Sequence, residues 1–271
     1  MLPLSPQVFN ILAAVVEERA GLHYGPADLL LLRDKVSPRA EQLGFDSLLD
    51  YYYFLRYDPA GPAELDLLVE LLVVHETYFF REVDQLRVLV RQLLPNLLLQ
   101  QRRVRVWCAA AATGEEPLSL AMLLESEGLL SRCAIVATDV SERALARARS
   151  GKFGGRSLRA LSASDEERWL ERKEDGVSLR KDLSASIEWA RLNLLDEDRI
   201  AALGKFEVIL LRNVLIYFSD ATVVRVVAAL ERALIPGGYL LVGASESLLR
   251  YSTGFQCREH GGAFFYQRAG R

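Results

Sequence analysis

The sequence predicts an α/β protein in which an all-helical N-terminal region precedes a doubly wound, mostly parallel sheet. Three observations predict this fold class. Up to about residue 100, the apolar residues recur at helical spacing only. Beyond that point, short apolar runs alternate with helical stretches, which is the order of a parallel α/β sheet. The composition, 51% hydrophobic and 25% charged over 271 residues, provides enough apolar surface for a sizeable core.

The N-terminal region begins with a recognisable helix start. Ser5 is a typical N-cap, Pro6 suits the first helical position, and Gly21 ends the apolar spacing that follows. Further helices are predicted over residues 28–36, 48–56, 63–74 and 84–98. We expect Pro38 to end or kink the second helix, because the residue before a proline avoids the α conformation.

The second region is predicted to supply the sheet. Strands are predicted over residues 104–108, 134–138, 187–192, 206–211 and 239–242, with a hairpin formed by 255–259 and 263–268. A closing antiparallel hairpin departs from a nicotinamide-type Rossmann sheet and suits the methyltransferase variant of that architecture. Residues 151–186, rich in glycine and charge, interrupt the alternation and indicate an inserted β element. We therefore expect domains at 1–75 and 76–271, with a small β-subdomain at about 151–190.

The charge distribution excludes some partners and supports two modules. The net charge is −3, so no overall basic field indicates nucleic-acid binding. Residues 1–75 contain 5 basic and 11 acidic side chains, whereas the rest contains 28 and 25.

Cysteine and histidine usage indicates a reducing compartment without a metal. The three cysteines and three histidines are scattered, without metal-ligand spacing or a disulfide framework. The N-terminus lacks a signal-peptide pattern, and charges interrupt every apolar stretch before about 18 residues. We expect a cytoplasmic protein that does not insert into membranes, and a monomer because no coiled-coil heptad is present.

The first candidate site follows the first predicted strand, over residues 107–117. Small residues at 109–112 allow a ligand to approach the backbone, and Thr113 and Glu116 have the spacing of a capping box. The alternative is simply a capped helix after a tight loop. Because there is no G-x-G-x-x-G and an acidic residue opens the helix, the pattern favours the cationic amino-acid moiety of S-adenosylmethionine over a dinucleotide.

Polar residues also end two other predicted strands. Asp139 follows the second strand, where Rossmann-like and methyltransferase folds hold a ribose diol, and Ser141 is free to cap the next helix instead. Arg212 and Asn213 follow a run of apolar residues. A buried strand that ends in such a pair needs polar partners, so we predict a ligand edge there, with a loop salt bridge as the alternative.

Six segments in order resemble one family. They are Thr-x-Phe-Phe-Arg at 77–81, the alanine-rich loop with Thr-Gly-Glu-Glu-Pro, Ala-Thr-Asp-Val-Ser, Asn-Leu-Leu at 193–195, Arg-Asn-Val-Leu-Ile-Tyr-Phe, and Pro-Gly-Gly-Tyr-Leu followed by Ser-Glu-Ser at 245–247. Over residues 5–268 the chain is similar to the CheR family of chemotaxis receptor methyltransferases. The resemblance implies methyl transfer from S-adenosylmethionine to glutamate side chains on chemoreceptor cytoplasmic helices. The products are glutamyl methyl esters and S-adenosylhomocysteine.

The resemblance also implies site residues. Cofactor binding falls to His75, Thr77, Arg81, Glu115, Asp139, Asn193, Leu194, Arg212 and Asn213, and catalysis to Arg81 and Tyr217. Asp139 would take the ribose hydroxyls, Asn193 and Leu194 would flank the adenine, and Glu115 would lie near the α-amino end. A carboxylate nucleophile is already anionic, so no strong general base is needed. Arg81 would orient the acceptor carboxylate through its planar fork, and Tyr217 would align the methyl group or hold that carboxylate.

Two departures from the family pattern bear on the acceptor. The family presents a basic helix to an acidic receptor bundle, but here only Arg33, Lys35 and Arg39 are available. Residues 172–178 lack the glycine pattern that grips a receptor's C-terminal pentapeptide in some relatives, so we expect tether-independent action. Two other functions stay open: a small-molecule S-adenosylmethionine methyltransferase, and a non-catalytic module that senses the cofactor. A chain that ends at Arg271 is either a minimal enzyme or a fragment.

Overall fold

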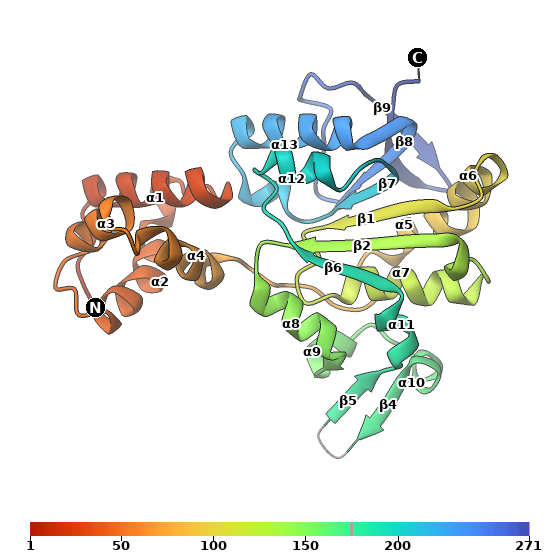
Figure 1. Cartoon of the computed structure of the whole chain (residues 1–271), viewed down its shortest axis with the longest axis horizontal. Helices are drawn as coiled ribbons and strands as arrows, with labels where there is room; N and C mark the ends of the chain where they lie inside the picture. The colour runs from red at the N-terminus through yellow and green to blue at the C-terminus, as the bar shows by residue number, and fades with distance from the viewer. Residues whose placement is uncertain (174–175, 271) are drawn as a thin grey trace. The chain divides into compact units, whose positions relative to one another are not determined.

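The computed structural model describes residues 1–173 and 176–270 (Figure 1). The chain forms two compact units. The first contains residues 1–74 together with 217–223, and the second contains 75–216 and 224–271. Each unit has its own cluster of buried apolar side chains. None of the helices in the described ranges is long and apolar enough to cross a membrane.

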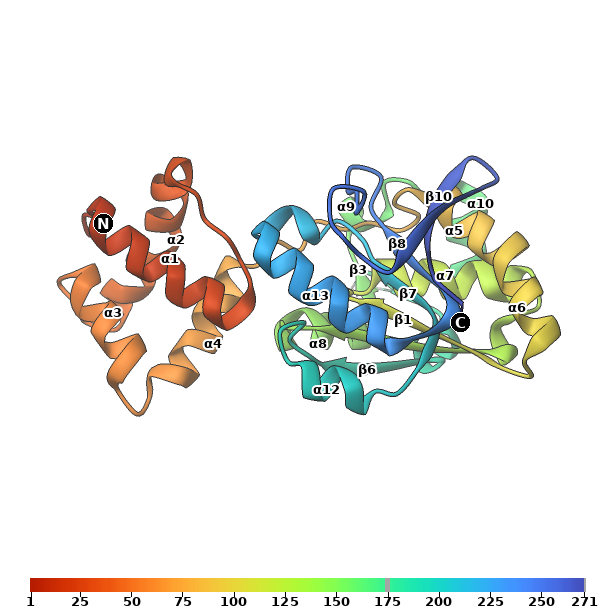
Figure 2. The ribbon, with the colours of Figure 1, turned by 90° about the horizontal axis from the view of Figure 1, so that it is seen from above.

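The first unit is built on four α-helices packed against one another (Figure 2). They are α1 (Pro6–Ala20), α2 (Leu29–Gln42), α3 (Leu48–Tyr57) and α4 (Gly61–Leu72), with a 3₁₀ turn at Pro26–Asp28. As predicted, the Ser5 hydroxyl accepts a hydrogen bond from the Val8 amide, and Gly21 ends α1 in the left-handed conformation. The inner faces of the four helices meet in one core that includes Leu12, Leu32 and Leu68.

The predicted end of the second helix at Pro38 is wrong. Helix α2 continues through the proline to Gln42. Val36 and Ala40, on either side of it, are fully buried, and the hydroxyl of buried Ser37 accepts a hydrogen bond from the Leu2 amide at 2.5 Å. The packing of this face outweighs the roughly 3 kcal/mol that an interior proline costs a helix.

The helical unit encloses an ion pair. The Arg39 guanidinium donates to both carboxylate oxygens of Glu64, at 2.7 and 2.6 Å, and the Tyr51 hydroxyl donates to the same carboxylate at 2.7 Å. Burial alone would raise the pKa of Glu64, but the hydrogen bonds from Arg39 and Tyr51 outweigh it and lower that pKa. This cluster, called the helical cluster below, links α2, α3 and α4.

The second unit contains a seven-stranded sheet. Its order is β6 (Ile187–Arg191), β2 (Cys133–Asp139), β1 (Val104–Ala109), β7 (Phe206–Leu211), β8 (Leu234–Val242), β10 (Ala263–Arg268) and β9 (Phe255–His260). The first five strands are parallel, and the last two are an antiparallel hairpin. The predicted strands and closing hairpin are therefore confirmed. The strand order reverses between β1 and β7, which is where such sheets bind ligands at their carboxyl ends.

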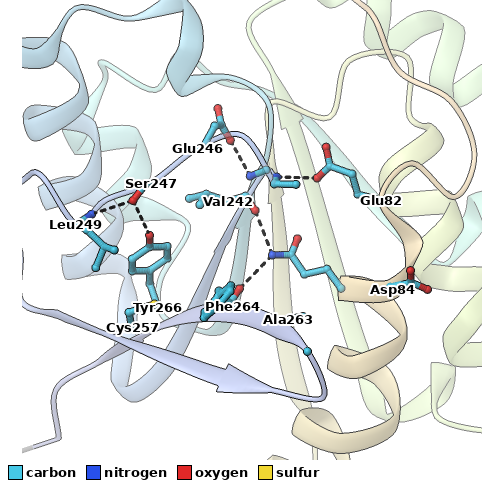
Figure 3. Close-up of a pocket in the computed structure, with 14 residues that line it drawn as sticks. Glu82, Asp84, Val242, Glu246, Ser247, Leu249, Cys257, Ala263, Phe264 and Tyr266 are labelled. Carbon is cyan, nitrogen blue, oxygen red and sulfur yellow. Dashed lines mark hydrogen bonds between the residues drawn. The ribbon is translucent and has the colours of Figure 1, made fainter.

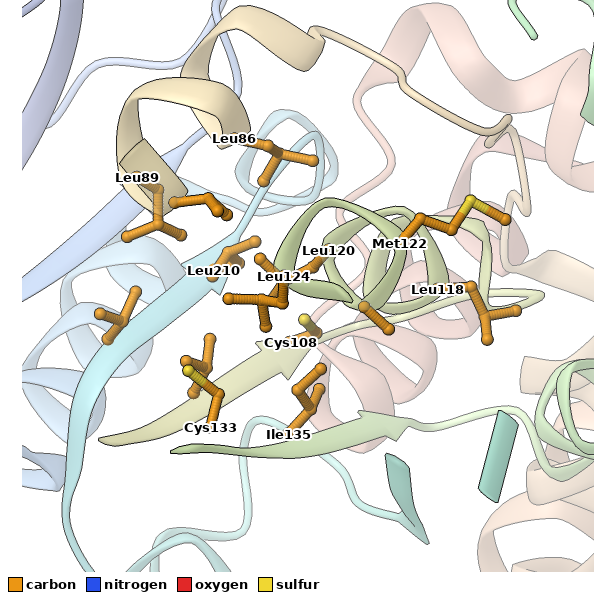
Figure 4. Packing of buried hydrophobic residues seen from close by; sticks show 14 of the residues in the cluster. Leu86, Leu89, Cys108, Leu118, Leu120, Met122, Leu124, Cys133, Ile135 and Leu210 are labelled. Carbon is orange, nitrogen blue, oxygen red and sulfur yellow. The ribbon is translucent and has the colours of Figure 1, made fainter. Parts of the chain in front are cut away.

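One face of the sheet packs on an apolar layer of helices (Figure 4). This layer consists of α5 (Val83–Val88), a π-helical turn (Leu89–Leu93), α6 (Leu94–Gln100) and α7 (Glu115–Ser126). Leu86, Leu120 and Leu124 from the layer lie in the same cluster as Cys108 and Ile135 from the strands. The chain after β2 also forms the helices α8 (Glu142–Ser150), α12 (Glu197–Ala202) and α13 (Asp220–Ala233). This packing fixes where the loops at the carboxyl edge begin.

The predicted insertion forms a small antiparallel sheet of its own. Strands β3 (Lys152–Phe153), β5 (Gly176–Leu179) and β4 (Leu170–Lys173) pair in that order. Short helices α9 (Gly155–Leu158), α10 (Ala163–Trp169) and α11 (Lys181–Ala185) accompany them. The expectation of tether-independent action rests partly on residues 174–175, which lie outside the described residues.

Candidate active site

Strained backbone gathers in the loops of the second unit. Among the described residues, five that are not glycine have positive φ angles: Phe80 (59°), Glu82 (48°), Ala110 (60°), Ala112 (47°) and Asn213 (59°). Two follow β1, one follows β7, and two lie just before α5. Left-handed backbone costs a non-glycine residue about 1–2 kcal/mol and often marks functional loops. The strain therefore points to the switch between β1 and β7.

Asp139 fastens the loop after β1 to the end of β2. Its carboxylate accepts hydrogen bonds from the amides of Ala112 at 2.8 Å and Ser141 at 2.9 Å. The Ser141 hydroxyl caps α8, as the sequence predicted. The carbonyl of Asp139 accepts a bond from the Leu192 amide at 2.9 Å, so the loop with Asn193 and Leu194 begins beside it. Three of the predicted cofactor residues thus share one edge.

Glu115 is held by two hydroxyl groups. Its carboxylate is almost fully buried and accepts hydrogen bonds from Thr113 and Ser157, both at 2.6 Å. The predicted capping box is wrong: Gly114 is the N-cap residue of α7, with no side-chain cap bond. The Thr113 hydroxyl is engaged with Glu115, and the Glu116 side chain turns to Arg212 instead.

Arg212 lies at the centre of a second buried charge cluster, called the edge cluster below. Its side chain is 1% exposed and donates to Glu116 at 2.7 Å and to Glu82 at 3.1 Å. A further bond, at 2.9 Å, reaches the carbonyl of Arg81. Its Nε–H is buried without a partner in the described part of the chain. The polar partners that the sequence predicted for the end of β7 are therefore carboxylates from two other segments.

The pKa values of this cluster follow from burial and charge. Burial raises the pKa of Glu116, and the attraction of Arg212 only partly opposes this effect. Burial also acts to raise the pKa of Glu82, but bonds from Ala244, Asn213 and Arg212 outweigh it and lower that pKa. For Arg212, burial acts to lower the pKa, but the two carboxylates outweigh it and raise that pKa. The arginine is thus held as a cation.

Two carboxylates join the loops after β7 and β8. Glu82 accepts from the Asn213 side chain at 3.1 Å and from the Ala244 amide at 2.9 Å. Glu246 accepts from four backbone amides, those of Asn213, Val214, Leu215 and Gly243, at 2.7–2.8 Å. This bonding holds Asn213 in its left-handed conformation.

Arg81 lies next to this cluster and is only partly buried. Its Nη1 donates to the Glu76 carbonyl at 2.5 Å, and its Nε lies 4.0 Å from a Glu82 oxygen. Bonds from the backbone of Phe79 and Phe80 to Ser157 and Ser119 anchor the preceding chain.

His75 and Thr77 are half-buried in the same segment as Arg81. Tyr217 belongs to the other compact unit, where its carbonyl accepts a bond from the His23 amide at 2.8 Å.

Sequence reasoning missed three residues: Glu82, Glu116 and Glu246. Glu116 and Glu246 stand inside segments that resemble the family, and Glu82 directly follows one, but each acquires its role from partners far along the chain. The available signal was the unsatisfied pair Arg212–Asn213 itself, because a buried cation requires carboxylates.

The edge is suited to a cofactor with a ribose and a charged end. It offers an acid at the end of β2, loops of small residues, and the buried Arg212 Nε–H that lacks a partner among the described residues. Residues 75–262 match the family profile "CheR methyltransferase, SAM binding domain", and residues 7–73 match "CheR methyltransferase, all-alpha domain". The chain belongs to the CheR methyltransferase family. It is an S-adenosylmethionine-dependent methyltransferase, as the sequence predicted, and S-adenosylhomocysteine is its product.

Curated relatives agree over most of the chain. It is 34% identical over 262 residues to the chemotaxis protein methyltransferase of Vibrio parahaemolyticus, covering 93% of this chain and 94% of the relative. It is 32% identical to chemotaxis protein methyltransferase 1 of Pseudomonas aeruginosa, covering 89% and 90%. The probable biofilm formation methyltransferase WspC of the same organism is 30% identical, and the match covers 89% of this chain and 57% of that protein.

Proposed function

We propose that this CheR-family enzyme methylates glutamate side chains on the cytoplasmic helices of chemoreceptors, as a cytoplasmic monomer. The relatives that match along nearly their whole length are named chemotaxis protein methyltransferases. The observation that carries the proposal is Arg81: a partly exposed guanidinium beside a strained, ion-paired edge can receive an anionic acceptor.

We assign the cofactor to the carboxyl edge of the sheet. Asp139 would hold the ribose, Asn193 and Leu194 the adenine, and Glu115 the α-amino end, while His75 and Thr77 would line the pocket. Arg212 and Asn213 would lie beneath. The carboxylates of Glu82 and Glu116 already bind Arg212. Arg212 therefore supports the cofactor site chiefly by fixing the backbone of Arg81.

The chemistry requires positioning rather than proton transfer. When bound, S-adenosylmethionine supplies a methyl group on a positively charged sulfur. The acceptor carboxylate is ionised at neutral pH, so no base has to activate it. Arg81 orients that carboxylate through its fork, and Tyr217 is the second catalytic residue that we propose. A half-buried site limits water around the acceptor, which favours displacement at carbon.

Titration calorimetry with S-adenosylhomocysteine tests the cofactor site. We expect micromolar binding to the wild type and a loss of at least tenfold in Asp139→Ala. The matched control is Asp198→Ala, an exposed acid on α12, which should bind as the wild type does. Folded wild-type protein that binds neither cofactor nor product would contradict the assignment.

A methyl-transfer assay tests the acceptor. Incubation with labelled S-adenosylmethionine and receptor-containing membranes should place label on the receptor as a base-labile ester. Label that accumulates only in small molecules would favour a small-molecule methyltransferase. Cofactor binding without any transfer would favour the sensing module.

We also propose that the enzyme acts without a receptor tether. The support is the sequence over 172–178, which lacks the glycine pattern of tether-binding relatives. Calorimetry with a receptor C-terminal pentapeptide should detect no binding, and micromolar affinity would overturn this proposal.

A further inference from the structure

A cavity of about 570 Å³ opens beside the carboxyl end of β8, between α5 and the hairpin β9–β10 (Figure 3). It is lined by Glu82, Asp84, Gln85, Val242, Gly243, Ala244, Glu246, Ser247, Leu249, Cys257, Gly262, Ala263, Phe264 and Tyr266. Its size is within the range of ligand pockets and can admit a long side chain with part of its backbone.

The cavity shares a wall with the active edge. Glu82 lines it and also bonds to Arg212 and Asn213. The Arg81 Nε lies 4.0 Å from the Glu82 carboxylate. A ligand bound at Arg81 therefore lies within one side chain of the cavity.

The inner surface of the cavity is largely apolar. Val242 and Tyr266 are buried residues of its lining, and Phe264 and Leu249 line it although they are 59% and 75% exposed. Large apolar side chains that gather in one exposed place are typical of a binding site.

The charged side chains that line the cavity are all acidic. Three of its lining residues are carboxylates: Glu82, Asp84 and Glu246. The Gln85 Oε1 is buried without a hydrogen-bond partner among the described residues, which is costly unless a ligand supplies a donor. Asp84 pairs with Arg87 at 3.0 Å, but both side chains are exposed and water screens that pair. Within the described chain, the lining contains no lysine, arginine or histidine.

We propose that this cavity binds a lysine or arginine side chain of the acceptor protein. The apolar stem would pack on Phe264 and Leu249, and the cationic end would lie near Glu82 and Asp84. Since Arg81 and the cavity flank the same Glu82, an acceptor helix would present this cation three or four residues from the methylated glutamate. The inference rests on the proposed function, because it assumes a protein acceptor.

Cys257 provides a built-in probe of the cavity. Its thiol is exposed and lines the cavity, whereas Cys108 and Cys133 are buried, and burial raises the pKa of both. With cystamine, the Cys257 sulfur attacks one disulfide sulfur, forms a mixed disulfide and releases one cysteamine, so no oxidant is required.

The first experiment compares three disulfides: cationic cystamine, neutral 2-hydroxyethyl disulfide and anionic dithiodiglycolate. The rate of mixed-disulfide formation with each reagent is divided by the rate for the same reagent with the urea-unfolded protein. We expect cystamine to be favoured over the neutral reagent at least fivefold, and less in Asp84→Asn. A Cys257→Ser, Leu99→Cys protein reports the general charge of the surface, because Leu99 is 85% exposed on α6. A preference equal to that control would overturn the proposal.

The second experiment measures the KM for the receptor substrate. In Leu249→Ala, Phe264→Ala we expect the KM for receptor to rise about tenfold, while Leu99→Ala leaves it unchanged. Affinity for S-adenosylhomocysteine should not change in either. An unchanged receptor KM overturns the cavity proposal alone. If the wild type transfers no methyl group to receptor, the proposed function fails, and the disulfide comparison still reports whether the cavity prefers cations.

Discussion

Each of the two units pairs an arginine with glutamate side chains, but the two arginines differ in how many carboxylates they bind. In the helical cluster, Arg39 forms a two-pronged bond with Glu64, and Tyr51 adds a third donor to the same carboxylate. In the edge cluster, Arg212 is divided between two carboxylates.

The clusters also differ in what surrounds them. The helical cluster links regular helices. The edge cluster joins strained loops, and the Arg212 Nε–H is buried with no partner in the described ranges. A buried ion pair therefore does not by itself mark a site. Strain and incomplete hydrogen bonding distinguish the pair at the sheet edge from the pair in the helical core.

The largest effect is expected from breaking the edge cluster with Arg212→Met. Glu82 and Glu116, whose side chains are 26% and 15% exposed, would lose their counter-ion, which costs about 3 kcal/mol of stability. All three tryptophans, Trp107, Trp169 and Trp189, lie in the second unit, so tryptophan fluorescence during urea unfolding reports this unit. Affinity for S-adenosylhomocysteine should also fall. Unfolding that matches the wild type would mean that the cluster contributes little.

Arg39→Met should break the helical cluster at a smaller cost, about 2 kcal/mol. Its side chain is 18% exposed, and Glu64 keeps the Tyr51 hydroxyl as a donor. Far-UV circular dichroism should record an earlier partial loss of helical signal, while the tryptophan signal of the second unit keeps its wild-type midpoint. Affinity for S-adenosylhomocysteine should stay as in the wild type, and a weaker affinity would contradict the separation of the two roles.

Paired glutamate-to-glutamine changes compare the clusters through turnover. Glu82→Gln keeps the shape but weakens the bonds that hold Asn213 and the backbone near Arg81. We expect kcat to fall about tenfold, equivalent to about 1.4 kcal/mol. Glu64→Gln should leave kcat within twofold. Equal effects in a methyl-transfer assay would show that the edge cluster has no special part in the reaction.

The smallest expected effect concerns pH. The pKa of Glu64 is lowered on folding from its ordinary 4.5, so its stabilisation is complete above about pH 4.5 and is lost as the pH falls below it. The pKa of Glu116 is raised, so its contribution has the opposite sign and grows as the pH falls towards 4.5. Between pH 6 and 3, Glu64→Gln should flatten the acid loss of helical signal. Glu116→Gln should steepen the loss of tryptophan signal, and the reverse order would contradict these directions.

Most of the fold could be predicted because local sequence specifies it. The strand β7 (Phe206–Leu211) is apolar apart from Glu207, and the hairpin turns at Gly261 and Gly262 with positive φ angles. The course of α2 through Pro38 could not be predicted, because long-range packing outweighs a local penalty.

The site divides in the same way. The position of Asp139 at the end of a strand was predictable, and its role in binding the cofactor stays a prediction. The roles of Glu82 and Glu246 were not, because both bind Asn213, which lies 131 residues after Glu82 and 33 residues before Glu246. The capping spacing of Thr113 and Glu116 was misleading, since Arg212, about a hundred residues later, takes the Glu116 side chain. Side chains that pair over long separations leave no periodic pattern in the sequence.

The return of residues 217–223 to the helical unit has a consequence for engineering. Leu22 and Phe218 form a β-bridge, and the His23 amide bonds to the carbonyl of Tyr217. A chimaera that exchanged only residues 1–74 with a relative would set foreign helices against a native segment, 217–223, that belongs to the same unit but lies far along the chain. Transplanting the helical unit between family members therefore requires moving both pieces together.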